Sequence, residues 1–480
     1  MKLYNTPTKK VEEFKPIKSG QVLMYTCGPT VYSKQHLGNY TAFIYWDTLI
    51  RALMLGGYNV QRVLNITDVG HLTSDADTGE DKMQKGAKKE GKTAWQVAEE
   101  WGNDFLKNFN ELNLTEPYKI SKATDYIDED LELIRTLKKK GYTYQIDDGI
   151  YYDTAKFPQY AKFAHLDIKA LKAGARVEHN PQKRNISDFA LWKFVQLGVA
   201  HDMQWPTPVD LLDKPGEVAG FPGWHLECST IIKKELGDTI DIHTGGIEHI
   251  PVHHTNEIAQ SEAATGKPLA NYWLHAHHIT ADGQKMSKSL NNGYTLDDIK
   301  ERGFKPVDFK MWVLQGQFMT NRNFTFKDLE AARQRLNNWR AIAALRHQLT
   351  EPEDTKESIK MLNQLENDVT QSVNDNLNTP QALAYVDSIF SKLEQLKLSE
   401  IDREALANFI KFLDDLLGLG LDKSTPDINE DTKQLIIARQ LARDNKDWQA
   451  ADELRDEIEQ NNDIVLNDRP NGGATWRYID

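Results

Sequence analysis

A chain of 480 residues is too long for one ordinary hydrophobic core, so we expect three or more domains. Its 40% hydrophobic and 27% charged residues are typical of a folded globular protein and exclude a largely disordered one. The formal net charge of −13 argues against a generally basic nucleic-acid binder but does not exclude a local basic face. No apolar run could span a bilayer, and the first six residues lack the apolar core of a signal peptide, so we expect a cytoplasmic protein that binds no membrane.

The first 66 residues follow a strand–helix–strand pattern. Residues 22–26 are apolar and partly β-branched, and Gly28-Pro29 ends this predicted strand. From Asn39 onward, apolar residues recur at helical spacing until Gly56-Gly57, and a second strand is predicted at 60–66. A strand–helix–strand unit of this length is typical of a parallel sheet.

The rest of the chain divides into three kinds of region. Residues 116–205 mix a helix with short strands and long loops, which indicates an insertion into the sheet domain. The α/β pattern returns at 206–325, and beyond 326 the chain is predicted to be almost entirely helical. The clearest predicted elements are helices at 129–140, 253–264, 331–349 and 431–444 and strands at 149–153, 239–243 and 272–279.

Two short segments have the chemistry of a nucleotide site, although the sequence contains neither a P-loop nor a dinucleotide fingerprint. His36-Leu37-Gly38-Asn39 lies between the first strand and helix, where helix N–H groups and an imidazole suit a phosphate; a purely structural loop histidine is the alternative. Lys285-Met286-Ser287-Lys288-Ser289 lies in a polar loop between Gly283 and Gly293. Two lysines three residues apart suit a leaving pyrophosphate, and a solvated basic loop is the alternative.

These segments resemble the two signatures of class I aminoacyl-tRNA synthetases, and within that class the chain is similar to the cysteinyl-tRNA synthetases. The resemblance covers essentially the whole length and includes segments 24–32, 65–68, 173–177, 223–228 and 253–260. It implies an α/β fold with a Rossmann-like parallel-sheet catalytic domain, an inserted domain, a helical bundle and a small C-terminal domain. The implied domains are the catalytic halves 1–115 and 206–325, the inserted connective domain 116–205, the helical tRNA-binding domain 326–425 and the anticodon-binding domain 426–480.

Two positions depart from the family pattern. The first signature ends in Asn39 where the family usually has histidine, and an amide donates a hydrogen bond but carries no charge. The Gly-Gly-x-Asp element that the family uses near the adenosine reads Gly245-Gly246-Ile247-Glu248, with a carboxylate one methylene longer. Both changes alter predicted contacts to ATP.

The only two cysteines, Cys27 and Cys228, form with His253 and Glu257 a plausible zinc set. His253 and Glu257 are four residues apart on a predicted helix and share a face, whereas His254 lies about 100° around that helix and is expected to be structural. Spacing alone does not distinguish this set from two buried thiols or a disulfide. The resemblance favours one zinc ion per chain, because all four family ligand positions hold the expected residue types.

The resemblance also implies a reaction: the L-cysteine carboxylate attacks the α-phosphorus of ATP, pyrophosphate leaves, and cysteine is transferred to tRNA(Cys). Zinc would favour cysteine over serine because it prefers thiolate to hydroxyl, so a separate editing site is unnecessary. The implied catalytic residues are His36, Asn39, Lys285 and Lys288, with Mg²⁺ accompanying ATP. The implied ATP contacts are His36, Gly38, Asn39, Gly245, Gly246, Glu248, Lys285, Ser287 and Lys288, and the implied cysteine contacts are Gly28, Thr67, Trp224 and His243.

Arginines and tryptophans alternate near the C-terminus, a pattern that suits stacking of unpaired anticodon bases; a solvated helix face is the alternative. The resemblance implies anticodon contacts by Arg443, Trp448, Asp452 and Asp468. Two rival functions are a ligase that joins cysteine to an amino sugar, which lacks the anticodon end, and a non-catalytic relative, which typically loses signature residues. Because this chain keeps both the C-terminal region and the signature residues, we expect a tRNA synthetase. We also expect it to act as a monomer.

Overall fold

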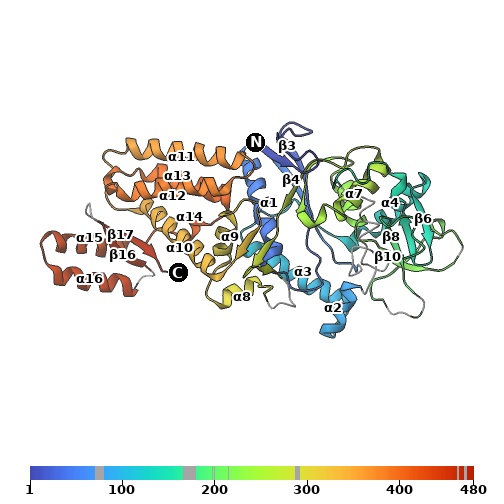
Figure 1. Cartoon of the computed structure of the whole chain (residues 1–480). Helices are drawn as coiled ribbons and strands as arrows, with labels where there is room; N and C mark the ends of the chain where they lie inside the picture. The colour runs from blue at the N-terminus through green and yellow to red at the C-terminus, as the bar shows by residue number, and fades with distance from the viewer. Residues whose placement is uncertain are drawn as a thin grey trace.

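The computed structural model shows an elongated molecule in which an inserted domain, a central sheet, a helical bundle and a small C-terminal domain follow one another (Figure 1). Within the described ranges, no helix combines the length and apolarity needed to cross a membrane. The structure describes residues 1–70, 81–165, 180–196, 198, 201–214, 216–286, 292–461, 464–469 and 473–479.

A five-stranded parallel sheet forms the centre, in the order β12-β11-β3-β4-β5. Its central strands are apolar and largely buried, as expected of a parallel sheet covered by helices. Helix α1 (Leu37–Leu55) connects β3 to β4 and ends at Gly56, close to both predicted boundaries. The carboxyl ends of the strands therefore meet at one edge, where α1 begins. The strands are β3 (Gln21–Thr26), β4 (Asn59–Ile66), β5 (Lys119–Lys122), β11 (Ile240–Gly246) and β12 (Ala270–Ala276).

Smaller elements extend this domain. Helix α3 packs on α1 through an aromatic cluster in which Phe105 lies against Tyr40 and Phe43. A hairpin of β1 and β2 covers the edge of β12, where the Thr6 N–H donates to the Trp273 carbonyl. The remaining elements of the catalytic domain are β1 (Lys2–Asn5), β2 (Lys10–Glu13), α2 (Lys82–Glu90), α3 (Ala94–Glu111), α6 (Leu226–Glu235), α7 (His253–Thr265), β13 (Ile279–Ala281), β14 (Gln284–Lys285), α8 (Leu296–Glu301), α9 (Pro306–Leu314) and β15 (Arg322–Phe324).

The insertion contains an antiparallel sheet in the order β6-β7-β8-β10-β9. The expected domain boundaries of 116 and 205 do not follow this sheet: β5 pairs with β4 in the central sheet, and β10 pairs with β8 in the inserted one. The sequence between these short strands carries no composition signal that marks such a boundary. The elements are α4 (Ile127–Lys139), β6 (Thr143–Ile146), β7 (Gly149–Tyr152), β8 (Phe189–Phe194), β9 (Trp205–Pro206) and β10 (Ala219–Pro222).

Asp130, fully buried on α4, makes stability depend on pH. Burial raises the pKa of Asp130 to about 8. Because the folded-state pKa lies above the unfolded one, this contribution to stability is present below about pH 4 and is lost as pH rises through about 8. Asp130→Asn should therefore raise the free energy of unfolding at pH 8 by roughly 3–5 kcal/mol, as measured by chemical denaturation.

Glu129→Gln is the matched control, because Glu129 lies one residue earlier and its carboxylate instead pairs with Lys234 at 2.8 Å on the surface. Removing this surface pair should cost at most about 1 kcal/mol. If the wild type and Asp130→Asn showed parallel stability curves from pH 5 to pH 8, the account of Asp130 would be wrong.

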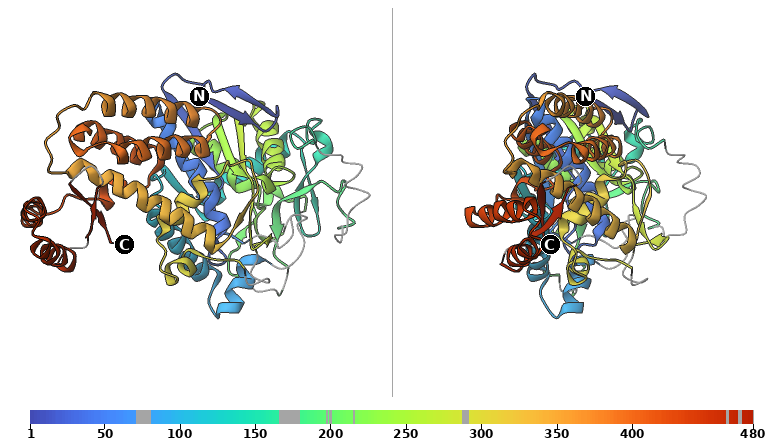
Figure 2. Two further views of the ribbon diagram at one scale, coloured as in Figure 1. Left: turned by 60° about the vertical axis from the view of Figure 1, so that its left-hand side comes forward. Right: turned by 90° about the vertical axis from the view of Figure 1, so that its left-hand side faces the viewer.

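The C-terminal third is a helical bundle followed by a small α/β domain, which lies at the end of the bundle away from the sheet (left view of Figure 2). The prediction that this third is almost entirely helical was wrong for its last part, where β16 (Ile464–Asp468) and β17 (Ala474–Tyr478) form an antiparallel hairpin. Its inward side chains, including Leu466 and Trp476, pack on the last two helices. The helices are α10 (Phe326–Ala343), α11 (Lys356–Asn374), α12 (Thr379–Gln395), α13 (Arg403–Leu417), α14 (Leu421–Ser424), α15 (Glu430–Asp444) and α16 (Trp448–Asn461).

Candidate active site

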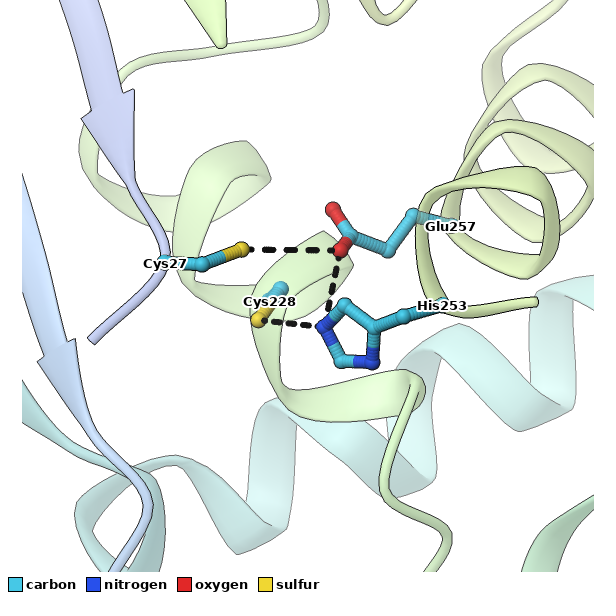
Figure 3. Close-up of side chains that lie close together, drawn as sticks. All are labelled: Cys27, Cys228, His253 and Glu257. Carbon is cyan, nitrogen blue, oxygen red and sulfur yellow. Dashed lines mark hydrogen bonds and ion pairs between the residues drawn. The ribbon is translucent and has the colours of Figure 1, made fainter. Parts of the chain in front are cut away.

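Four buried side chains from three elements converge beside the carboxyl end of β3 (Figure 3). Cys27 follows β3 and is fixed there because its N–H donates to the Thr244 carbonyl of β11. Cys228 lies in the first turn of α6, and His253 and Glu257 lie one turn apart on α7. The structure thus brings together the four residues predicted to be metal ligands.

The spacing of the four donor atoms fits a tetrahedral ion. His253 Nε2 lies 3.0 Å from Glu257 Oε1 and 3.5 Å from Cys228 Sγ, and Cys27 Sγ lies 3.9 Å from Glu257 Oε1. Bonds of about 2.0–2.3 Å to a tetrahedral zinc separate its ligands by about 3.3–3.8 Å. The donor set of two thiols, an imidazole and a carboxylate is also one that zinc accepts, so the residues could hold a metal ion.

A second set shares two of these ligands. Cys27 and Glu257 also lie within 4.8 Å of donor atoms of His243 and His254. The expectation that His254 points away from the cluster was wrong: its Nε2 lies 3.3 Å from Cys27 Sγ, because the end of β3 lies against the first turn of α7. Its other nitrogen bonds His275 at 2.8 Å, which orients the ring.

The electrostatics favour a bound cation. Burial alone would raise the pKa of Cys27, but its hydrogen bond with Cys228 and the nearby His254 hold that pKa well below its usual value. Glu257 is also buried, yet His243 lowers its pKa to about 2. These shifts favour the anionic forms of Cys27 and Glu257, the forms that bind a cation, whereas burial and the adjacent Cys27 raise the pKa of Cys228 well above its usual value.

The residues predicted to contact cysteine surround this cluster. Gly28 approaches the Asn65 backbone so closely that a Cβ would lie 1.6 Å from the Asn65 carbonyl oxygen, so this position requires glycine. The Thr67 hydroxyl donates to Glu227 at 2.6 Å, and the Trp224 ring lies 4.6 Å from that of His253.

His243 differs from these residues in its role. Its Nε2 bonds Glu257 at 2.7 Å, and its ring stacks on Trp273, so it orients a candidate ligand. Sequence reasoning missed Glu227 as the partner of Thr67, although Glu227 lies directly beside Cys228 in a segment of family resemblance.

The first signature begins α1. His36 is the N-cap residue, and the Asn39 side-chain oxygen accepts a hydrogen bond from the His36 N–H at 3.1 Å. The Leu37 N–H donates to the Tyr294 carbonyl at 2.7 Å, and the Asn39 N–H donates to His36. Two of the first three N–H groups of α1 are therefore already bonded, so this turn has fewer N–H groups that could donate hydrogen bonds to a phosphate.

The glycine pair at the end of β11 lies close to the side chains of His249, His254 and Glu248. A Cβ on Gly245 would lie 2.7 Å from His254, and one on Gly246 would lie 2.2 Å from the Glu248 carboxylate. Glu248 in turn faces His278 at 3.5 Å. Gly38 of the first signature lies close to the sulfur of Met286, but Ser287 and Lys288 lie outside the described residues, as does the side chain of Lys285.

The predicted anticodon residues divide into two groups. Asp468 accepts hydrogen bonds from Arg439 at 2.8 Å and Arg443 at 3.0 Å, and these arginines lower its pKa, so this carboxylate is engaged within the domain. Trp448 is 58% exposed, with the Arg443 guanidinium 5.9 Å from its ring centre. Asp452 is also exposed, on α16.

The fold is similar to the folds of two solved aminoacyl-tRNA synthetases. The methionyl-tRNA synthetase of Mycobacterium tuberculosis bound by methionyl-adenylate superposes with a TM-score of 0.58 at 12% identity, covering 84% of this chain and 92% of that one. The LeuRS of Agrobacterium radiobacter, in a ternary complex with tRNA and LeuAMS, gives a TM-score of 0.62 at 11% identity, covering 86% and 85%.

Sequence comparisons give the family. Residues 13–334 match the family of tRNA synthetases class I (C) catalytic domains, and residues 425–477 match the cysteinyl-tRNA ligase anticodon binding domain. The chain is 41% identical to cysteine–tRNA ligase 1 of Burkholderia lata over 95% of this chain and 93% of the relative. It is 37% identical to the cysteine–tRNA ligase of Treponema denticola over the full length of both. The chain therefore belongs to the cysteine–tRNA ligase family of class I aminoacyl-tRNA synthetases.

Proposed function

We propose that this chain is a cysteine–tRNA ligase that selects its amino acid at the cluster of Cys27, Cys228, His253 and Glu257. The observation that carries the proposal is this cluster itself, which lies at the carboxyl edge of the sheet in a chain of this family. Zinc bound there would supply a soft Lewis acid that prefers the thiolate of cysteine to the hydroxyl of serine.

The chain's own residues would then orient the amino acid and ATP. Gly28, Thr67 and Trp224 lie beside the cluster and would shape the amino-acid pocket. The cysteine carboxylate forms a bond to the α-phosphorus of ATP while the bond from that phosphorus to pyrophosphate breaks. No general base is required, because the carboxylate is already ionised at neutral pH.

Charge neutralisation and positioning would provide the catalysis. His36 and Asn39 would contact the phosphates from the start of α1, together with Gly38, while Gly245, Gly246 and Glu248 would face the adenosine. Lys285, Ser287 and Lys288 would stabilise the leaving pyrophosphate with Mg²⁺.

The acceptor is tRNA(Cys), whose 3′ end receives cysteine while AMP leaves. We propose that the protein acts as a monomer. We also expect the protein to act in the cytoplasm, where tRNA is charged.

Trp448→Ala tests the proposed anticodon contact. Loss of one stacked base should cost roughly 1–3 kcal/mol, so kcat/KM for tRNA(Cys) should fall by about 5- to 100-fold. Cysteine-dependent ATP–pyrophosphate exchange should not change, because Trp448 begins α16, which lies at the end of the bundle away from the sheet (Figure 1).

Trp95→Ala is the matched control, since Trp95 is similarly exposed at 46% but lies on α3 of the catalytic domain. If the wild type and Trp448→Ala charged tRNA(Cys) equally well, the proposed anticodon contact of Trp448 would be wrong. The rival amino-sugar ligase predicts that an amino-sugar acceptor works and that Trp448 has no effect, and the non-catalytic rival predicts no pyrophosphate exchange at all.

A further inference from the structure

An ion pair joins the two signature regions of the catalytic domain. Lys34 lies two residues before His36, in the loop that leads from Cys27 to α1. Its ammonium pairs with the carboxylate of Asp297 in the first turn of α8, the first described helix after the lysine signature. The two side chains are 30% and 37% exposed, so water only partly screens the pair.

Further charges extend this pair to a third element. Lys300 Nζ lies 2.8 Å from Asp297 and 2.8 Å from Glu111 at the end of α3, and Lys107 lies 3.8 Å from Glu111. The charges alternate in sign, and each carboxylate has a lysine on both sides. Asp297 therefore connects the loop before α1 with α3 and α8.

Two uncharged contacts join the same regions independently. The Leu37 N–H of the first signature donates to the carbonyl of Tyr294, three residues before Asp297. Within the lysine signature itself, Met286 is buried, and its sulfur lies 3.5 Å from the position that a Cβ of Gly38 would occupy. One residue of the lysine signature and one residue that follows it thus lie against the first signature.

We propose that Lys34 and Asp297 are positioning residues for adenylate formation, because their pair sets the separation of the two signatures. This inference rests on the proposed function. In-line attack needs the α-phosphate and the leaving pyrophosphate held between the two signatures at one distance, and a misplacement of about 1 Å can cost about 100-fold in rate. In this assignment neither residue touches the reacting atoms. Lys34 positions the loop before α1, and Asp297 positions the start of α8.

A double-mutant cycle on the full chain tests the proposal. Lys34→Met should lower kcat of cysteine-dependent ATP–pyrophosphate exchange by about fivefold, because it breaks the Lys34–Asp297 pair. Asp297→Asn should lower it by at least as much, because it breaks that pair and also the pair with Lys300. The double variant should be no slower than the slower single variant, because the two residues act as one unit. KM for cysteine should not change, and Lys34→Arg should restore at least half of the wild-type rate.

Lys267→Met serves as the control, because Lys267 forms a comparable surface pair with Asp238 at 2.8 Å near the amino ends of the strands. It should leave the exchange rate unchanged. Single-variant losses that multiply in the double variant, or unchanged kcat in both single variants, would overturn the inference. A wild type that shows no cysteine-dependent exchange would instead overturn the proposed function, so the two failures are distinguishable.

Discussion

Replacement of Cys228 by serine is expected to remove most of the bound zinc and to lower cysteine-dependent adenylate formation by at least about 100-fold. Loss of a residue that only supports a ligand already costs 10- to 100-fold in metal affinity, and Cys228 is a proposed ligand. The serine hydroxyl is nearly the same size but is a poor zinc ligand, so the change tests donor chemistry and disturbs packing little. Metal content by elemental analysis and the exchange rate should fall together.

Two histidine variants decide which of the two ligand sets holds the ion. His253 and His254 are adjacent on α7, and each lies within 3.5 Å of one of the two cysteine sulfurs. His253→Gln should lose zinc as Cys228→Ser does, whereas His254→Gln should keep most of it. Lys233→Met, on the exposed part of α6, should retain both metal and activity. Full activity in a zinc-free preparation would contradict the proposed metal role, and zinc loss confined to His254→Gln would assign the other set.

Replacement of Lys288 by alanine should slow adenylate formation by about 10²- to 10³-fold. Charge stabilisation of a leaving group is worth roughly 3–4 kcal/mol, which converts to that range of rates. Cysteine affinity should barely change, because we place its recognition at the metal cluster. Single-turnover adenylate formation and the KM for cysteine separate these two effects.

Lys288→Arg is the conservative control and should retain more activity than alanine, because it keeps the charge. Lys288 lies outside the described residues, so this expectation depends on the sequence of the lysine signature. A fall in cysteine affinity with an unchanged chemical step would mean that the loop has another role.

The central part of the fold follows directly from the sequence. Helix α1 was predicted within about two residues at each end, because its apolar residues recur over five turns and Gly56 ends it. The hairpin of β16 and β17 was missed because each strand has only five residues, and such short alternation does not outweigh the strong helical pattern before it. In the insertion, β10 lies between β8 and β9, out of sequence order, so the register could not be predicted.

The candidate site was predictable in composition but not in geometry. The resemblance supplied Cys27, Cys228, His253 and Glu257, yet only the folded chain brings segments more than 200 residues apart within 4.8 Å. Helical periodicity predicted that His254 faces away from the metal ligands. Such a pattern describes one helix alone and does not include the end of β3, where the sulfur of Cys27 lies close to His254. The bonds of Asp468 to Arg439 and Arg443 likewise depend on how β16 folds back on α15.

The most direct test of the central claim is ATP–pyrophosphate exchange by the purified full chain with each of the twenty amino acids. Our account predicts exchange with cysteine alone and at least about 100-fold less with serine, because a hydroxyl is a poor ligand for zinc. The cysteine-dependent exchange should disappear when zinc is removed and return when zinc is restored. Comparable exchange with serine, exchange with a different amino acid, or no exchange with cysteine would contradict the account.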